Sequence, residues 1–410
     1  MDRNEIRVAA LMAGAAFFTL AGYEAIRSAS TVLFKNAYGA ENLPLVMAAM
    51  PFVVFAGVAG YGRLLTTLGP RRTLVVTSLG SGLLIFACYL LVLAGSKPVT
   101  PVLYLLKEFY IVLLIEQYWS YINSSLSSGT ARKLNGPITG IAGLGSVAGG
   151  FITGISAKAL GTDAMLLLAA FSLVPAALVS NLTYKLHGEP RQPDQSADET
   201  QRNPAGHMGL GLFRKNPVLA YLLAIVFVSQ FMSAALDLRF QGLLSIDFAG
   251  RQDEETAFQG FFFSALSTAA LVLQFVLAPL MLSFISLRLI HIMMPLIHVT
   301  TIGVAIVAPS VWTVGAALFF FKAFDYSIFR AAKEVLYIPF SFDIRYRAKE
   351  VIDVFGYRAG KGISAIGIVA LQRAGVAMGA WYLPVAMAGA VLWLALIFPL
   401  TSDAPATRED

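Results

Sequence analysis

The chain has 410 residues, of which 57% are hydrophobic and only 13% are charged. Soluble domains carry roughly 25% charged residues, so this composition excludes an ordinary soluble enzyme and indicates a polytopic membrane protein. The net charge of +6 is typical of basic cytoplasmic loops and does not require a nucleic-acid partner. The single cysteine, Cys88, excludes a disulfide framework and a cysteine-based metal cluster.

Apolar blocks along the chain predict about twelve membrane-spanning helices. The first block follows Arg3 and Arg7 but continues into charged residues without a cleavage site, so we interpret it as a retained helix and not as a signal peptide. In chain order, the predicted spans lie near Val8–Phe34, Leu43–Tyr61, Leu74–Leu93, Pro101–Ile122, Ile138–Leu160, Ala164–Tyr184, Val218–Leu238, Phe258–Ser283, Leu289–Ala308, Val311–Pro339, Val351–Leu371 and Trp381–Leu400.

A polar segment after the sixth predicted span divides the chain. The stretch Leu186–Gly209 contains Pro and Gly and lacks hydrophobic periodicity, as is typical of a flexible linker. We therefore predict an N-terminal half over residues 1–185, a cytoplasmic linker over 186–215, a C-terminal half over 216–402 and a tail over 403–410. Two halves of about six helices joined by a long loop indicate an all-α, major facilitator-like fold.

The positions of Lys and Arg predict the orientation of the chain. They gather in alternate loops, among them those holding Arg71, Arg72 and Arg132, on the side of the N-terminus. Because basic loops stay in the cytoplasm, we predict that both termini are cytoplasmic. The loop Gly62–Leu74 is similar to the facilitator loop motif of glycine, an acidic residue and a basic cluster, except that Thr66 stands at the acidic position.

The tenth predicted span carries charges inside an otherwise apolar stretch: Lys322, Asp325, Arg330, Lys333 and Glu334. A charge at bilayer depth costs at least about 2.5–3.5 kcal/mol on insertion scales, so it usually faces a partner or a wet cavity. On a regular α-helix Arg330 and Glu334 can pair, and Asp325 lies one turn from Lys322. Lys333 is then the least compensated charge, which predicts an anchor for an anionic substrate. The alternative is a lysine that snorkels to the cytoplasmic interface.

Other predicted spans also contain charges. Glu108 and Glu116 lie in the fourth span, where a carboxylate can carry a proton or hold a substrate cation. We expect Glu116 to face the interior, whereas Glu108 alternatively anchors the outer surface. Glu24 and Arg27 in the first span are well spaced to pair, and Asp237 lies near the outer end of the seventh.

The remaining motifs argue against enzymatic chemistry. The glycine-rich stretch Gly136–Gly154 predicts close helix packing, because a dinucleotide fingerprint requires a preceding strand in a βαβ unit. The sequence has no Walker A loop, no nucleophile elbow and no His/Cys cluster with metal spacing. We therefore expect neither an enzyme nor a cofactor.

Specific segments resemble the nucleotide transporter family, the ATP/ADP translocases of plastids and intracellular bacteria. They read DYSIFRAAKEVLYIPF and RYRAKEVIDVFGYRAGKGIS around the tenth span, AGYEAIRSASTVLFKNAYGAENLP in the first and KEFYIVLLIEQYWSYIN in the fourth. The family ties transport to a lysine in span one, a glutamate in span four, a glutamate in span seven and a lysine in span ten. By this resemblance Lys333 matches the lysine of span ten, and Glu108 matches the glutamate of span four within about one position. Asp237 stands at the glutamate of span seven, and Ser30 stands where the family has the lysine of span one.

These observations predict a secondary transporter of the bacterial inner membrane that moves a nucleotide, a phosphorylated metabolite or another anionic solute by alternating access. We expect a monomer in the lipid bilayer. The expected substrate-binding residues are Lys333, Arg27, Glu108, Asp237 and Arg330, and the expected coupling or gating residues are Glu116, Asp325, Glu24 and Glu334.

Two alternatives remain open: a proton-coupled carrier of a different small solute, and a non-transporting membrane receptor or scaffold. In the first alternative a proton is the coupling ion. If Glu24 neutralises Arg27, the N-terminal half offers no free cation, and ATP is expected to bind weakly.

Overall fold

The computed structural model describes residues 2–189, 213, 216–338, 340, 351–352, 356–357 and 360–402. Residues 190–212, 214 and 215 of the predicted linker, residues 353–355, 358 and 359 of the predicted eleventh span, and the predicted tail, 403–410, lie outside this part of the chain. Within it, the secondary structure is helical and no strand occurs. The predicted all-α class is therefore confirmed.

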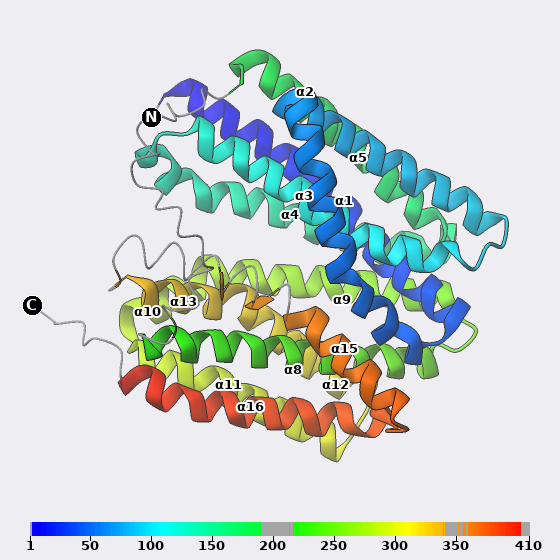
Figure 1. Cartoon of the computed structure of the whole chain (residues 1–410), viewed down its shortest axis with the longest axis vertical. Helices are drawn as coiled ribbons and strands as arrows, with labels where there is room; N and C mark the ends of the chain where they lie inside the picture. The colour runs from blue at the N-terminus through cyan, green and yellow to red at the C-terminus, as the bar shows by residue number, and fades with distance from the viewer. Residues whose placement is uncertain are drawn as a thin grey trace, which may run out of the picture. The chain divides into compact units, whose positions relative to one another are not determined.

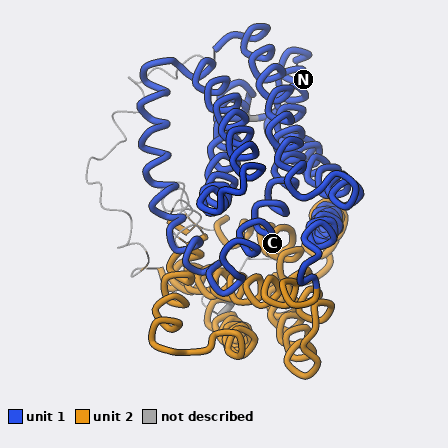
Figure 2. The backbone as a smooth tube through the Cα atoms, turned by 90° about the vertical axis from the view of Figure 1, so that its right-hand side faces the viewer, with its two compact units in different colours: residues 1–194, 248–271 blue, residues 195–247, 272–410 orange. Residues whose placement is uncertain are grey.

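The chain forms two compact units, coloured separately in Figure 2. Unit 1 consists of residues 1–194 and 248–271, and unit 2 consists of residues 195–247 and 272–410. A short piece from the middle of the sequence thus packs with the N-terminal helices. The division into halves and a linker that the sequence suggested stays a prediction.

Unit 1 is built around α1 (Figure 1). Its helices are α1 (Arg3–Tyr38), the 3₁₀ turn η1 (Ala40–Asn42), α2 (Leu43–Leu93), α3 (Val99–Ser125), α4 (Ser128–Leu160), α5 (Ala164–His187) and most of α9 (Gln252–Val272). Helix α1 packs against α3, α4 and α5, and α2 packs against α3 and α5. Small side chains on α1, such as Ala13, Ala25 and Ala29, are fully buried and allow its neighbours to approach closely.

Helix α2 covers two predicted spans and the loop between them. The loop motif Gly62–Leu74 was expected to be non-helical, but only Gly69 leaves helical geometry, with φ 73° and ψ 166°. This region of the backbone is readily open only to glycine, and the following Pro70 cannot continue the hydrogen bonding of the preceding turn. The expectation of a loop was wrong because one kinked residue is enough to redirect the helix.

Unit 2 contains α8 (Pro217–Asp247), the π-helical segment η2 (Leu273–Leu277), α10 (Ala278–Phe284), α11 (Leu287–Val307), α12 (Val311–Phe324), the π-helical segment η3 (Asp325–Phe329), α13 (Arg330–Tyr337), α15 (Gly360–Arg373) and α16 (Met378–Ser402). Helix α8 packs against α12, α15 and α16, and α11 packs against α12 and α16. The two π-helical segments η2 and η3 also contact each other.

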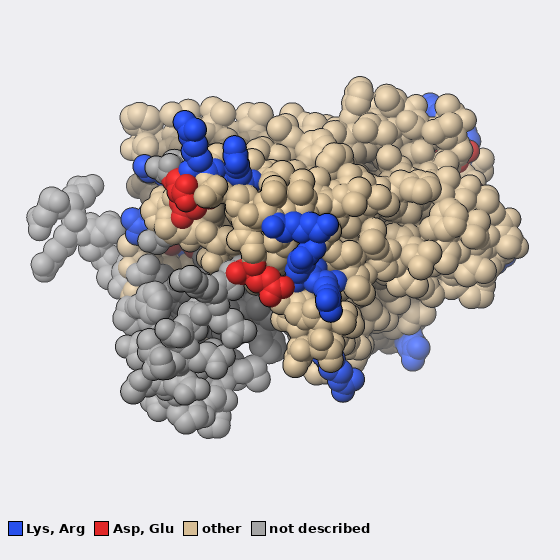
Figure 3. Space-filling view, turned by 90° about the horizontal axis from the view of Figure 1, so that it is seen from above, with Lys and Arg blue, Asp and Glu red and all other residues tan. Residues whose placement is uncertain are grey.

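Among the described residues, nine helices are long and apolar enough to cross a membrane. Large apolar side chains such as Phe55, Phe284 and Trp312 are exposed, as expected where lipid and not water surrounds a helix. In the view of Figure 3 the charged side chains gather in a few patches on a largely uncharged surface. The protein is therefore a multi-pass membrane protein, whereas the exact number of about twelve crossings stays a prediction.

Candidate functional site

The charged segment of the tenth predicted span is not one continuous α-helix. Helix α12 ends at Phe324, the π-helical segment η3 follows, and α13 begins at Arg330. Short π-helical segments are rare and occur frequently at functional sites. A π-turn holds more residues than an α-turn, so the α-helical spacing that predicted which charges share a face does not apply across η3.

Lys333 in α13 is one of the largest fully buried side chains, with 2% of its surface exposed. Its ammonium nitrogen lies 4.7 Å from the centroid of the Tyr357 ring, within the range of a cation–π interaction. A snorkelling lysine would expose its ammonium to the interface, so this burial argues against that alternative.

Asp325, at the start of η3, is buried close to several cations. It is 6% exposed, and its Oδ1 atom has no hydrogen-bond partner among the described residues. The positive charges that act on it are those of Lys322, Arg330 and Lys333. We call these four residues the C-terminal cluster. In this cluster Lys322 donates a hydrogen bond of 2.7 Å to Ser233 of α8, while Arg330 is exposed.

A second cluster lies in unit 1, where Glu24 and Arg27 form the pair that the sequence predicted. Arg27 Nη1 lies 3.4 Å from Glu24 Oε2, and the guanidinium carbon lies 3.6 Å from the centroid of the Phe263 ring in α9. Lys107 of α3, only 2% exposed, donates a hydrogen bond of 2.8 Å to Thr31. We call Glu24, Arg27 and Lys107 the N-terminal cluster.

Lys107 was not among the predicted site residues. Its ammonium nitrogen lies 3.7 Å from the centroid of the Tyr104 ring, so an aromatic face as well as a hydroxyl orients it. The sequence contained a signal, because Lys107 directly precedes Glu108 inside an apolar span, and a surface anchor was only the alternative to a role inside the bundle. The burial of Lys107 argues against that alternative for this residue.

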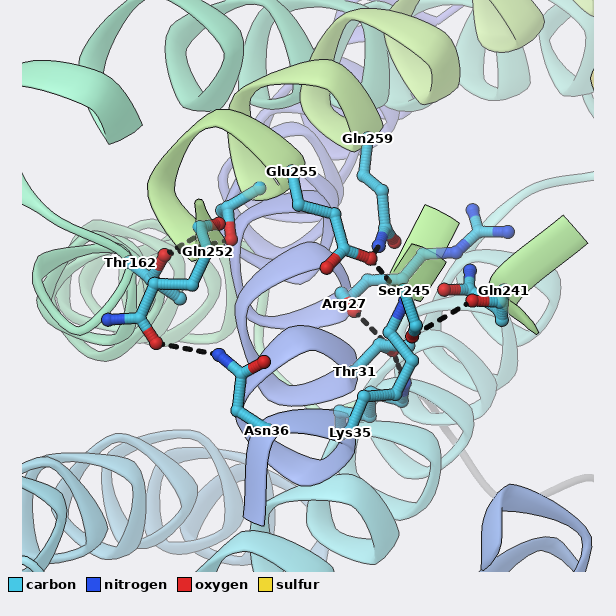
Figure 4. Close-up of polar contacts among 12 residues, drawn as sticks. Arg27, Thr31, Lys35, Asn36, Thr162, Gln241, Ser245, Gln252, Glu255 and Gln259 are labelled. Carbon is cyan, nitrogen blue, oxygen red and sulfur yellow. Dashed lines mark hydrogen bonds and ion pairs between the residues drawn. The ribbon is translucent and has the colours of Figure 1, made fainter. Parts of the chain in front are cut away.

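An ion pair between Lys35 of α1 and Glu255 of α9 is also buried, with side-chain exposures of 1% and 3%. Gln259 donates a further hydrogen bond of 3.2 Å to Glu255 (Figure 4). Sequence reasoning missed Glu255 because it began the eighth span at Phe258, whereas α9 begins at Gln252. Acidic residues favour the first turn of a helix, and Asp253, Glu254 and Glu255 were the signal for an earlier start.

The structure does not gather all of the predicted site residues. Glu108, Asp237 and Glu334 are half-buried. Glu116, which was expected to face the interior, is exposed, whereas its neighbour Gln117 is buried and donates a hydrogen bond of 3.0 Å to Thr77. The roles of these residues in binding and coupling stay predictions.

Comparison with known proteins agrees with the sequence over one part of the chain. Residues 257–403 match the family model of the TLC ATP/ADP transporters. The resemblance to ATP/ADP translocases is confirmed for these residues. No curated protein matches the sequence.

Solved transporter structures share the fold at low sequence identity. The nucleoside transporter NupG is 12% identical, with a TM-score of 0.67, over 98% of this chain and 99% of its own. A D-xylose-proton symporter is 16% identical, with a TM-score of 0.69, over 99% of each chain. A bacterial homologue of the iron transporter ferroportin, in an inward-facing state, is 12% identical, with a TM-score of 0.70, over 98% of this chain and 100% of its own.

At these identities the likeness establishes the fold and not a substrate. The predicted major facilitator-like fold is therefore confirmed. Together with the match of residues 257–403 to the ATP/ADP transporter model, this fold supports a membrane carrier.

Proposed function

We propose that this transporter is a secondary active carrier of a small phosphorylated anion, a class that includes nucleotides and phosphorylated metabolites. The observation that carries the proposal is the burial of Lys333 beside the π-helical segment η3, with 2% of the residue exposed. An ionisable group inside a membrane protein is expensive to keep and usually marks a substrate or ion pathway.

The balance of charge in the C-terminal cluster favours an anion over a neutral solute. Three cations act on the one carboxylate of Asp325. Phosphate oxygens accept hydrogen bonds from lysine and arginine, and such charge-assisted bonds are roughly twice as strong as neutral ones. A phosphorylated solute would therefore offset the cost of burying Lys333 while it is bound.

The N-terminal cluster supports a second point of attachment. Glu24 and the Phe263 ring hold Arg27, while Thr31 and Tyr104 orient Lys107. The hypothesis of weak ATP binding considered only the pair of Glu24 and Arg27. We propose that Arg27 and Lys107 form a second binding point for the carried anion within unit 1.

A proton-coupled carrier is the second candidate, and one specific observation favours it. Asp325 is a buried carboxylate whose Oδ1 atom has no hydrogen-bond partner among the described residues. A carboxyl group in such surroundings can take up and release a proton as the neighbouring cations bind or lose an anion. Proton uptake by Asp325 is compatible with binding of an anion by the neighbouring cations, so this role would add to anion binding and not replace it.

The proposal is tested by ligand-induced thermal stabilisation of the purified protein with inorganic pyrophosphate and, separately, with ATP. We expect either probe to raise the melting temperature of the wild type, since a ligand at 100 times its Kd contributes about 2.7 kcal/mol. Lys333→Met should weaken binding by roughly tenfold to a hundredfold, the effect of losing a hydrogen bond to a charged group.

Lys97→Met is the matched control, because Lys97 is exposed and lies outside both clusters. It should bind pyrophosphate like the wild type. If Lys333→Met keeps wild-type affinity, Lys333 does not bind the anion and the proposal fails. The earlier expectation of weak ATP binding is checked in the same titration, and micromolar ATP affinity would favour nucleotide exchange.

A further inference from the structure

An ion pair and a hydrogen bond connect the first turns of α9 to α1 (Figure 4). Lys35 pairs with Glu255, and Asn36 donates a hydrogen bond of 2.7 Å to Gln252. The first contact is buried, whereas the second is exposed. By the predicted orientation, these contacts lie toward the outer face of the membrane.

The same part of α9 touches α4 backbone to backbone. A Cβ atom added to Gly260 would lie 2.6 Å from the amide nitrogen of Gly154 and 2.8 Å from the carbonyl oxygen of Gly150. Glycines permit this close approach. The Phe261 ring also packs edge-on against Phe151. Ser264 donates a hydrogen bond of 2.8 Å to the carbonyl oxygen of Val147, so the contact is tight.

The helix that carries Glu255 changes partners partway along its length. Residues up to Leu271 belong to unit 1, and residues from Val272 onward belong to unit 2. The change coincides with the π-helical segment η2, which begins at Leu273 and contacts η3, the segment that begins with Asp325. One continuous helical segment thus connects the Lys35–Glu255 pair with the C-terminal cluster.

A buried ion pair usually adds little to the net stability of a fold. Desolvation of the two charges offsets most of their attraction, and well-packed apolar residues often stabilise a fold equally well. An ion pair has a different advantage in a moving part, because both partners regain hydration when water enters between them. The pair can then be broken at a lower cost than its burial suggests.

We propose that Lys35 and Glu255 form a releasable gate. In the closed state the pair holds the first turns of α9 against α1 and α4, and in the open state the pair separates, Gly260 moves away from Gly150 and Gly154, and water enters. The inference goes beyond the proposed function, since it concerns access of water to the interior of unit 1 and holds for any carried solute.

The experiment measures access to a cysteine beneath the pair. Ser28 is fully buried on α1, two turns from Lys35, and its hydroxyl donates a hydrogen bond of 3.1 Å to the carbonyl oxygen of Glu24. In a Cys88→Ser background, Ser28→Cys is labelled with a membrane-impermeant maleimide in intact cells and in inside-out vesicles. We expect Glu255→Gln to raise the labelling rate roughly tenfold from one side of the membrane only, a typical size for a shift between two conformations.

A charge exchange separates gating from misfolding. Lys35→Glu alone should also speed labelling, while the double variant Lys35→Glu with Glu255→Lys should return it toward the wild-type rate. Gly260→Ala should speed labelling with the ion pair intact, because its Cβ collides with backbone atoms of α4. The matched controls are Arg251→Ala, at the exposed pair with Glu254, and Gly14→Ala, where nothing lies within 4 Å.

The gate is overturned by either of two results. Labelling that stays at the wild-type rate in folded Glu255→Gln and Gly260→Ala would show that the contacts never open. Labelling that rises equally from both sides would show general loosening of the fold. Neither result depends on which solute is carried, so failure of the gate is distinguishable from failure of the anion-binding proposal.

Discussion

Lys35 with Glu255 in unit 1, and Lys333 with Asp325 in unit 2, are all nearly fully buried, yet their surroundings differ. Glu255 receives hydrogen bonds from both Lys35 and Gln259. Asp325 retains an oxygen without a hydrogen-bond partner among the described residues, and Lys333 faces the ring of Tyr357. One carboxylate is thus well satisfied by protein groups, and the other is not.

We interpret this contrast as a difference between charges that hold helices together and charges to which our proposal assigns a ligand. Substitution of one partner of a hydrogen-bonded buried pair is costly, because the other charge is left uncompensated. A buried polar atom without a partner is already in an unfavourable state, and such atoms require a functional or solvent explanation. We therefore expect substitutions in the first region to affect stability and those in the second to affect binding.

The largest expected effect on stability is at the Lys35–Glu255 pair. Lys35→Met should lower the free energy of unfolding by about 3–5 kcal/mol, and the double variant Lys35→Met with Glu255→Leu should recover much of this loss. Thermal and denaturant unfolding of the detergent-purified variants measures both effects. If the single and double variants are equally unstable, the two side chains are not energetically coupled.

The exposed pair of Arg251 and Glu254 provides the control for that comparison. Its side chains are 53% and 42% exposed. Solvent screens such pairs, so Arg251→Ala should change the free energy of unfolding by less than about 1 kcal/mol. A larger loss of unfolding free energy would mean that any change in the first turns of α9 destabilises the protein, so the effect of Lys35→Met could not be assigned to burial of its ion pair.

An intermediate effect is expected at Asp325, on binding and not on folding. Asp325→Asn keeps the shape and removes a negative charge from among Lys322, Arg330 and Lys333, so pyrophosphate should bind roughly threefold to tenfold more tightly, about 0.7 to 1.4 kcal/mol. Stability should stay close to that of the wild type. Isothermal titration with pyrophosphate measures the change, and weaker binding would show that Asp325 orients the cations and does not oppose the anion.

The same variant distinguishes the second candidate function. If Asp325 carries the coupling proton, Asp325→Asn should abolish uphill accumulation driven by a pH gradient while exchange across the membrane continues. Accumulation that persists in the variant would assign the proton pathway, if there is one, to other residues.

The smallest effect is expected at Asp163, which lies in the turn between α4 and α5. Partial burial, and next the negative charge of Asp253, raise the pKa of the Asp163 carboxyl above its ordinary value. A raised pKa means that folding disfavours the ionised form, so this group's unfavourable contribution grows as the pH rises through the window above the ordinary aspartate range.

Asp163→Asn should therefore be more stable than the wild type near pH 7, by less than about 1 kcal/mol because the group is half-exposed. The advantage should shrink as the pH falls toward the ordinary aspartate pKa of about 3.9, where the wild-type carboxyl is protonated. Melting temperatures at a series of pH values measure it. An advantage that does not change with pH would rule out the charge as its cause.

Much of the architecture followed from the sequence, because the bilayer imposes strong composition rules. Helix α5 (Ala164–His187) and helix α16 (Met378–Ser402) lie where continuous apolar runs predicted spans. Helix boundaries were less predictable where charges stand at a helix end. Glu255 lay outside the predicted eighth span, which began at Phe258. Local spacing could not reveal its ion pair, because Lys35 is 220 positions away in the sequence.

For the site, the sequence determined that charges lie at bilayer depth in the first, fourth and tenth predicted spans, because a polar residue in an apolar run is visible without any structure. Only the tertiary structure decided which of these charges are buried and with which groups they pair. The π-helical segment η3 changes which side chains share a face, and packing buries Lys107 while it leaves Glu116 exposed. Pairing between distant helices depends on their crossing and rotation, and these are set by packing across the whole unit, which local spacing does not encode.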